Sequence, residues 1–337
     1  MKRNILSLQP KELETVVYEL GEKRFRADQI FGWLAKGITS FEEMRNVSAS
    51  LRGKLEVNFY IGLPRVVTEQ RSSDGTVKCL YEFQDGARVE SVFMKYSYGN
   101  SVCISSQAGC RMGCSFCAST LDGLERNLEP GEMLGEVIAM KNLTGEDIRH
   151  VVVMGMGEPF DNYEGLSGFI NLIHSDRGYG LSMRAITVST CGIIPGIKKF
   201  GEDFPAVNLA VSLHAPNGNL RKKLMPVANA YGYEDLLTAC REYTELTGRR
   251  ITFEYSMISG VNDSADDAKE LASHLEGWLT HVNLIPLNRV EGKEYEASQK
   301  DKIAVFKRIL EEHNVAVTVR RTLGSDIDAA CGQLRNR

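Results

Sequence analysis

Four of the eight cysteines of this chain lie within one stretch, CISSQAGCRMGCSFC, which runs from Cys103 to Cys117. Three of them, Cys110, Cys114 and Cys117, have the spacing C-x3-C-x2-C. Thiolates from so tight a loop can converge on one face of an iron–sulfur cube, and the fourth iron then stays open to a small molecule. The alternative is a structural zinc site in which Cys103 supplies the fourth sulfur, although zinc-binding cysteines usually come as two C-x2-C pairs.

The composition is ordinary for a globular protein of the cytoplasm. The chain has 337 residues, of which 43% are hydrophobic and 25% charged, enough for one large α/β domain and a small appendage. We expect no membrane association, because the sequence contains no apolar run of about 18 residues and does not begin with a secretory signal. In the cytoplasm thiols stay reduced, so clustered cysteines indicate metal binding or catalysis.

A net charge of −4 argues against a strongly basic nucleic-acid-binding protein. Any RNA binding must therefore come from local basic patches, although a solvated surface is the commoner explanation of each patch. The candidate patches are Lys23, Arg24 and Arg26; Arg221, Lys222 and Lys223; and Arg320 and Arg321.

Three regions differ in hydrophobic period. Residues 1–60 have helical spacing, as in PKELETVVYEL, and predict a small helical domain. Residues 61–95 alternate in polarity and contain the turn dipeptides Asp74-Gly75 and Asp85-Gly86, which predicts a β-hairpin or meander linker. Residues 96–337 alternate between strand-like and helix-like runs, which favours a parallel sheet.

The predicted strands of the third region begin at VCIS and continue through HVVVMGMG, RAITVST, VNLAVSLH, RITFEYSMI, HVNLIPLN and VAVTVRR. The last predicted helix, SQKDKIAVFKRILEEHN, opens on a capping pattern at Ser298 and Asp301. The pattern is compatible with a full or partial TIM-like barrel and with an open doubly wound sheet. In both folds, ligands bind at the carboxyl ends of the strands.

The cysteine loop after the first strand, with Phe116 before its last cysteine, resembles the radical S-adenosylmethionine (SAM) superfamily. The segment GMGEP after the second strand resembles the superfamily's glycine-rich contact to the SAM amino group. The resemblance narrows to the dual-specificity methyltransferases of adenine carbon 2 in 23S ribosomal RNA and transfer RNA. It rests on GEKRFRADQIFGWL, CISSQAGC, CSFCAST, GLERNL, MGMGEPFDNY, ITVSTCGIIP, AVSLHA, LMPV, TFEY, NLIPLN and GSDIDAACGQLR.

This resemblance implies a partial (β/α)6 radical SAM barrel with a [4Fe-4S] cluster on Cys110, Cys114 and Cys117. It implies that SAM contacts fall on seven residues at the ends of predicted strands. These are Gly157, Glu158, Ser189, Ser212, Leu213, His214 and Asn288. His214 alone is as compatible with a hydrogen-bonded residue at a strand end as with a SAM contact.

The resemblance also implies three catalytic residues and two molecules of SAM per turnover. Carbon 2 of adenine is too electron-poor to attack a methyl group, whereas a thiolate does so readily. Cys331 of the tail DAACGQL would take a methyl group from one SAM, and a radical made from a second SAM would activate it. Adenine carbon 2 would then join to that carbon, Glu90 would take the carbon-2 proton, and Cys103 would release the product by forming a disulfide with Cys331. Without the resemblance, Glu90 is an ordinary solvated glutamate on a hairpin.

The remaining cysteines, Cys79, Cys240 and Cys191, are predicted to be inert buried residues, with Cys191 close to a SAM contact. The implied partners are 23S rRNA, in protein-free or precursor form, tRNA, and an electron donor such as flavodoxin, with the enzyme a monomer. One alternative is the related carbon-8 methyltransferase of the chloramphenicol–florfenicol resistance type. Others are a non-catalytic RNA-binding protein with a structural metal, and a radical SAM activase of another protein.

Overall fold

The computed structural model describes residues 2–290 and 292–335. The helices are α1 (Pro10–Glu19), α2 (Arg26–Ala35), α3 (Ala49–Asn58), α4 (Pro130–Thr144), α5 (Tyr163–His174), α6 (Ile194–Asp203), α7 (Gly218–Leu224), α8 (Tyr233–Thr247), α9 (Ala265–Leu275) and α10 (Lys300–Glu312). The strands are β1 (Arg3–Asn4), β2 (Phe59–Tyr60), β3 (Arg65–Arg71), β4 (Val77–Glu82), β5 (Arg88–Met94), β6 (Ser101–Ile104), β7 (Gln107–Gly109), β8 (Leu124–Asn127), β9 (His150–Val153), β10 (Ile186–Thr190), β11 (Asn208–Ser212), β12 (Ile251–Met257), β13 (Thr280–Pro286) and β14 (Ala316–Val319).

One curved sheet of ten strands organises the molecule, in the order β14-β13-β12-β11-β10-β9-β6-β5-β4-β3. The seven strands from β6 to β14 are parallel and follow one another in chain order. A doubly wound sheet would reverse its strand order at a switch point, and this sheet does not. Six strand–helix units followed by β14 therefore form the predicted partial barrel, and the fold class is confirmed.

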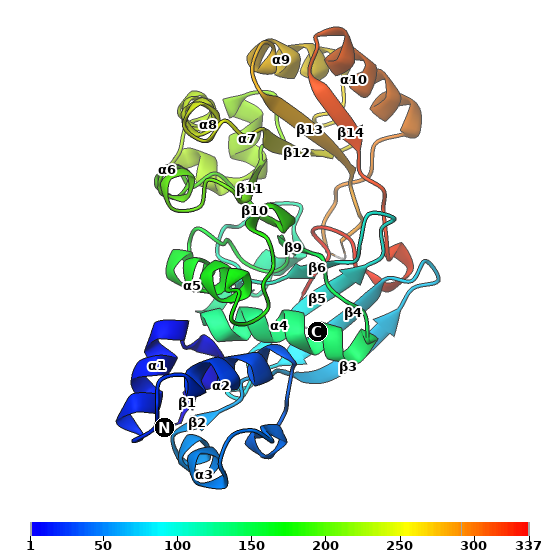
Figure 1. Cartoon of the computed structure of the whole chain (residues 1–337). Helices are drawn as coiled ribbons and strands as arrows, with labels where there is room; N and C mark the ends of the chain where they lie inside the picture. Colours follow the sequence, from blue (N-terminus) through cyan, green and yellow to red (C-terminus); the bar gives the residue numbers. More distant parts are fainter. Residues whose placement is uncertain (1, 291, 336–337) are drawn as a thin grey trace.

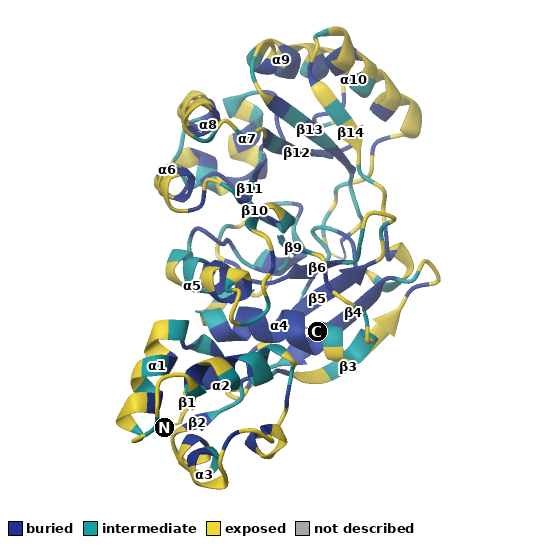
Figure 2. Ribbon diagram, in the orientation of Figure 1, coloured by how far each residue is buried: buried dark blue, intermediate teal, exposed yellow. Residues whose placement is uncertain are grey.

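The crossover helices lie in an arc on the outer face of the curved sheet (Figure 1). The parallel strands from β6 to β13 are largely buried between these helices and the barrel interior, while the two edge strands β3 and β14 are exposed over most of their length (Figure 2). Side chains at the carboxyl ends of successive parallel strands therefore meet at one rim of the barrel, as expected for a ligand site.

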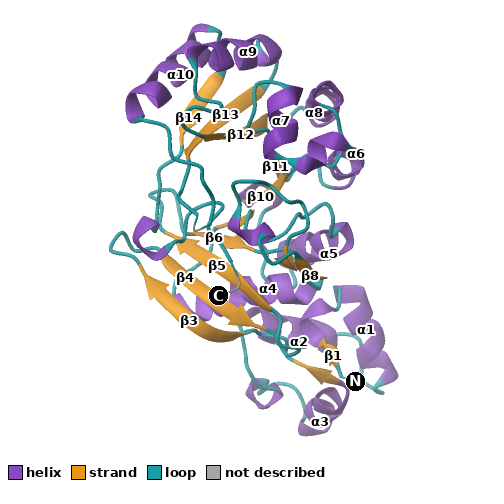
Figure 3. Cartoon of the chain, turned by 180° about the vertical axis from the view of Figure 1, so that it is seen from behind, coloured by secondary structure: helices purple, strands orange, loops and turns teal. Residues whose placement is uncertain are grey.

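The segment predicted as a meander forms the antiparallel strands β3, β4 and β5. Both turn glycines have positive φ, +89° at Gly75 and +91° at Gly86. The meander is more than a linker, because β5 pairs antiparallel with β6 in the register Val92 to Cys103. The view from behind shows the same sheet passing from the parallel strands into the meander (Figure 3).

The N-terminal helices α1, α2 and α3 pack below α4 and α5 (Figure 1). Gly131 on α4 allows the close approach, since a Cβ there would lie 2.4 Å from the backbone nitrogen of Ser7. The side chain of Gln9 also donates a hydrogen bond to the carbonyl of Gly168 on α5, at 3.0 Å. The division into domains at residues 1–60, 61–95 and 96–337 remains a proposal. The meander strands belong to the same sheet as the barrel strands.

Two local predictions are wrong. Gln299, and not Ser298, is the N-cap of α10, and the Ser298 hydroxyl instead donates to Asp263 in the loop before α9, at 2.9 Å. Arg221 is not part of a solvated basic face: its side chain is 0% exposed, while its neighbours Lys222 and Lys223 are exposed. Among the described residues, no helix combines the length and apolarity needed to cross a bilayer.

Candidate functional site

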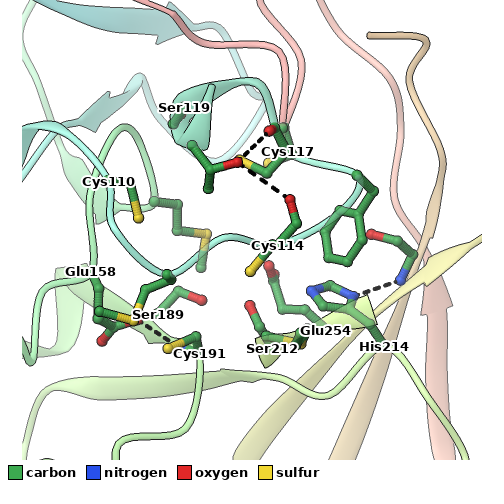
Figure 4. A pocket seen from close by; sticks show the side chains of 18 of the residues that line it. Cys110, Cys114, Cys117, Ser119, Glu158, Ser189, Cys191, Ser212, His214 and Glu254 are labelled. Carbon is green, nitrogen blue, oxygen red and sulfur yellow. Dashed lines mark hydrogen bonds between the residues drawn. The ribbon is translucent and has the colours of Figure 1, made fainter. Parts of the chain in front are cut away.

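Cys110, Cys114 and Cys117 lie on the loop that follows β7, and all three line one cavity, which we call the cluster pocket (Figure 4). The loop is fixed at both ends by backbone hydrogen bonds. The Cys110 amide donates to the carbonyl of Gly123 at 2.8 Å, and the Ser115 amide donates to the carbonyl of Leu224 at 2.9 Å. The predicted metal ligands are therefore brought together on a rigid turn.

This set of donors fits an iron–sulfur cluster. Burial raises the pKa of the Cys110 thiol to about 12 and also raises the pKa of Cys114 and Cys117. Loss of these protons therefore requires a compensating positive charge, which bound iron supplies. Within the described residues, no three His, Cys, Asp or Glu side chains are arranged to hold a single metal ion.

Cys103 does not join the three cysteines. It lies on β6 and lines a second, smaller cavity together with Cys331 and Arg320, which we call the thiol pocket. The structural zinc site with Cys103 as fourth ligand is therefore not assembled. Two further cysteines, Cys191 and Cys331, line the cluster pocket, and the thiol and backbone amide of Cys191 both face the carboxylate of Glu158.

Six of the seven residues predicted to contact SAM line the cluster pocket. These are Gly157, Glu158, Ser189, Ser212, His214 and Asn288. The seventh, Leu213, is 0% exposed and packs into the hydrophobic core. Successive side chains of extended backbone point to opposite faces, so Ser212 at the end of β11 faces the pocket while Leu213 faces away from it. His214 follows with a left-handed φ of +55° and also lines the pocket.

Gly157 has φ +99° and touches the segment that carries the cysteine loop. A Cβ at this position would lie 2.6 Å from Cβ of Gln107 and 2.8 Å from the backbone nitrogen of Gln107. Gln107 in turn accepts a hydrogen bond from the Glu158 amide at 2.8 Å. Only glycine fits here, and its small size lets the GMGEP segment lie directly against the strand that precedes the cysteine loop.

Glu158 is buried, and its carboxylate is held by three donors. The Thr190 hydroxyl donates at 2.7 Å, the Cys191 amide at 2.6 Å and the Phe160 amide at 3.0 Å. Burial raises the pKa of Glu158, while these hydrogen bonds oppose the rise. The carboxylate therefore has a fixed orientation at the rim of the barrel, between the ends of β9 and β10.

His214 is a buried residue with φ +55°. Its Nδ1 accepts a hydrogen bond from the Ser256 amide at 2.9 Å, so the proton of the neutral ring lies on Nε2. Burial and, secondarily, the nearby Arg221 lower the pKa of His214 to about 3. The ring stacks edge-on against Phe116 of the cysteine loop, with centroids 4.8 Å apart. The histidine thus both makes structural hydrogen bonds and lines the pocket.

Cys331 lies where the two pockets meet, because it lines both the cluster pocket and the thiol pocket. Backbone contacts hold its tail over the cysteine loop: the Ala118 amide donates to the carbonyl of Gly332 at 2.8 Å. The side-chain amide of Asn288 donates to the carbonyl of Cys331 at 3.2 Å. Burial raises the pKa of the Cys331 thiol, and the Arg320 guanidinium opposes this rise.

Glu90 is not the solvated residue that an isolated hairpin would give, since only 3% of it is exposed. Its carboxylate lies 3.3 Å from the Lys78 ammonium and accepts a hydrogen bond from the Arg335 amide at 2.7 Å. Burial raises the pKa of Glu90, and the Lys78 ammonium and the Arg335 amide only partly oppose this rise. Glu90 lines an open groove that also reaches Asn288 and adjoins the tail.

Sequence reasoning missed several residues of the site. Thr190, Glu254 and Ser256 line the cluster pocket, and Arg320 pairs with Glu254 at 3.7 Å. Glu254 was within reach, because it stands in the TFEY segment that carries part of the resemblance. Arg320 had no local signal, since a basic pair at a strand end is usually solvent-exposed.

Two family models match the chain, Ribosomal RNA large subunit methyltransferase N-terminal domain over residues 3–61 and Radical SAM superfamily over residues 104–272. A curated relative, "Probable dual-specificity RNA methyltransferase RlmN" of Clostridium perfringens (strain SM101 / Type A), is 51% identical over 335 residues, covering 99% of this chain and 96% of its own length. The protein of the same name from Lachnospira eligens is 50% identical over 336 residues, with the same coverage. The crystal structure of a radical SAM methyltransferase from Sphaerobacter thermophilus superimposes with a TM-score of 0.96 at 42% identity, covering 99% of this chain and 100% of that one.

Proposed function

This chain belongs to the RlmN family of dual-specificity RNA methyltransferases in the radical SAM superfamily, and from that premise we propose that it methylates carbon 2 of adenosine. It is a radical SAM RNA methyltransferase, and its cofactors are a [4Fe-4S] cluster and SAM. We propose as substrates an adenosine of the peptidyl-transferase centre in protein-free or precursor 23S rRNA and the adenosine 3′ to the anticodon of tRNA. The electron donor, of flavodoxin type, and a monomeric state belong to the same proposal.

Cys110, Cys114 and Cys117 are the proposed ligands of the cluster, which when bound supplies the electron that cleaves SAM. The remaining lining of the cluster pocket orients SAM at the strand ends. Glu158 provides a fixed carboxylate for the SAM amino group, and Ser189 and Ser212 provide hydroxyls from the neighbouring strands. The buried walls of the pocket, among them Phe116, exclude water from the reactive species.

The observation that carries the proposal is the position of Cys331 between the two pockets. On the side of the cluster pocket, its thiolate can attack the methyl group of SAM and displace S-adenosylhomocysteine. On the side of the thiol pocket, it faces Cys103. A thiol that both receives the methyl group and later exchanges into a disulfide needs these two neighbours, and the fold supplies them from segments more than two hundred residues apart.

Product release follows from the remaining two residues. When the methylene radical on Cys331 has joined adenine, Glu90 accepts the carbon-2 proton, and the one electron that the adduct must lose would return to the bound cluster. The thiolate of Cys103 then attacks the sulfur of Cys331. The carbon–sulfur bond breaks, its electron pair goes to the methylene carbon, and a proton completes the methyl group. The raised pKa of Glu90 suits a proton acceptor, because a more basic carboxylate holds a transferred proton more firmly.

The N-terminal helices are the proposed RNA-binding part. Two aromatic side chains, Tyr18 and Phe25, are 64% and 50% exposed. Each is covered by an arginine, with the guanidinium carbon of Arg24 lying 5.5 Å from the Tyr18 ring and that of Arg26 lying 4.9 Å from the Phe25 ring. Paired cations and exposed rings suit phosphates and unstacked bases.

The test is anaerobic incubation of reconstituted enzyme with SAM, a reductant and a 23S rRNA fragment, followed by mass analysis of nucleosides and of the tail peptide. We expect 2-methyladenosine in the RNA and a methyl group on Cys331. Formation of 8-methyladenosine alone would instead support the carbon-8 alternative. The matched control is Cys240→Ala, which removes a fully buried thiol outside both pockets and is expected to retain the activity. Product formation by Cys331→Ala would refute the proposal.

A further inference from the structure

Arg221, on α7, is a buried cation with incomplete hydrogen bonding. Its side chain is 0% exposed, and its Nη2 donates to the carbonyls of Cys191 at 2.5 Å and Ser212 at 3.2 Å. Its Nε and Nη1 are buried without a hydrogen-bond partner, and the described groups that act on it electrostatically are thiols and a phenol, with no carboxylate among them. Burial of an unpaired guanidinium costs several kcal/mol, so a compensating anion is expected nearby.

The space for this guanidinium is built into the backbone. Gly192 has φ +102°, and a Cβ there would lie 3.0 Å from Nη2 of Arg221. The two accepting carbonyls belong to the ends of β10 and β11, where the cluster pocket begins. Arg221 is therefore held behind the wall of the pocket by the backbone of the strand ends.

The neighbouring protein groups do not balance its charge. His214 is neutral, since its pKa is about 3, and the thiols of Cys191 and Cys240 are protonated because burial raises their pKa. Tyr233 is likewise a neutral phenol, because burial raises its pKa. The remaining neighbour is Cys114, which lines the cluster pocket and interacts electrostatically with Arg221. A cluster bound to three thiolates carries net negative charge, and it becomes more negative when it is reduced.

We propose that Arg221 is the buried counter-charge of the iron–sulfur cluster and raises its reduction potential. A fixed positive charge in a region of low dielectric stabilises the reduced cluster more than the oxidised one, because the reduced cluster is the more anionic. The helix that carries Arg221 is joined to the cluster loop, since the Leu224 carbonyl accepts from the Ser115 amide at 2.9 Å. Leu224 and Met225 also pack against Cys114. This inference rests on the proposed ligation by the three cysteines.

The experiment compares reconstituted wild-type protein with Arg221→Met, Arg221→Lys and the control Lys222→Met. Lys222 is a cation on the same helix but is exposed to solvent, so its removal is screened by water. The readouts are iron content and a redox titration followed by the electron paramagnetic resonance signal of the reduced cluster. We expect Arg221→Met to lower the ratio of reduced to oxidised cluster at a fixed potential at least tenfold, which is 59 mV for one electron. Arg221→Lys should recover most of this loss, and Lys222→Met should match the wild type.

Two outcomes separate the inference from the function on which it rests. Wild-type protein that binds no iron would overturn the assignment of the three cysteines. Normal iron content with an unchanged potential in Arg221→Met would overturn the counter-charge role alone. If Arg221→Met does not fold, Arg221→Gln keeps a donor for the two carbonyls but removes the charge. Arg221→Gln must then show the same tenfold lower ratio of reduced to oxidised cluster. A wild-type reduction potential in that variant would equally refute the inference.

Discussion

Replacing Gly157 by alanine tests whether the GMGEP segment is fixed by direct contact with the strand before the cysteine loop. The backbone at Gly157, with φ +99°, is disfavoured for any residue with a side chain, at a cost of about 1–2 kcal/mol. The new methyl group would also lie 2.6 Å from Cβ of Gln107 and 2.8 Å from its backbone nitrogen. Such overpacking typically costs about 1–3 kcal/mol more. The expected loss in the free energy of unfolding is therefore about 2–5 kcal/mol.

Gly86 provides the matched control. It has φ +91° in the turn between β4 and β5, and a Cβ there would meet no atom within 4 Å. Gly86→Ala therefore carries the conformational cost without the collision, and the effect of alanine on the unfolded chain is common to both variants. The assay is urea unfolding of both variants, together with SAM affinity of the reconstituted proteins measured by anaerobic calorimetry.

Gly157→Ala should be less stable than Gly86→Ala by about 1–3 kcal/mol. It should also bind SAM at least tenfold more weakly. The backbone can relieve the collision only if Glu158 moves away from its hydrogen-bond partners, and a loss of about 1.4 kcal/mol in SAM binding is a tenfold loss of affinity. Gly86→Ala should bind SAM like the wild type. Equal stability of the two variants, or unchanged SAM affinity in Gly157→Ala, would refute the reasoning that close contact at this glycine positions the SAM site.

Three further predictions concern the thiols and the buried histidine. Cys103→Ala should keep its iron and accumulate a covalent protein–RNA adduct on denaturing gels, whereas Cys117→Ala should lose iron; iron loss in Cys103→Ala would mean that Cys103 is a ligand. Methylation of Cys331 should speed up as pH rises, because the thiolate reacts and burial raises the pKa of the thiol. Arg320→Gln removes the cation that lowers this pKa, so the midpoint of the pH profile should move to higher pH in single-turnover mass spectrometry; an unmoved midpoint would exclude this role of Arg320. Between pH 7 and pH 5 the unfolded chain binds a proton that folded His214, with its pKa of about 3, does not, so acidification should cost about 2 kcal/mol of stability in the wild type. His214→Asn, which tolerates the positive φ, should lose that pH dependence in urea unfolding, and an equal drop in both proteins would contradict it.

Much of the fold and part of the site could be predicted from local sequence. The cysteine spacing places three thiols on one turn whatever the rest of the chain does, since the loop is too short to separate them. The alternation of strands and helices predicts a parallel sheet, and it places Ser189 and Ser212 at the same rim. Side chains alternate between the two faces of a strand, which predicts that Leu213 and Ser212 face opposite sides.

Other features depend on segments that only folding brings together. Cys103 and Cys331 share a pocket because the C-terminal tail folds back over the cysteine loop, and no spacing in the sequence indicates that contact. Glu90 and Arg221 both looked like solvated surface charges, because the exposure of a charged residue depends on what packs over it. Sequence by itself determined which residues are neighbours along the chain and which face of an element they occupy. The tertiary structure decided which charges lost their water and which partners replaced it, because burial is a property of the whole packed fold.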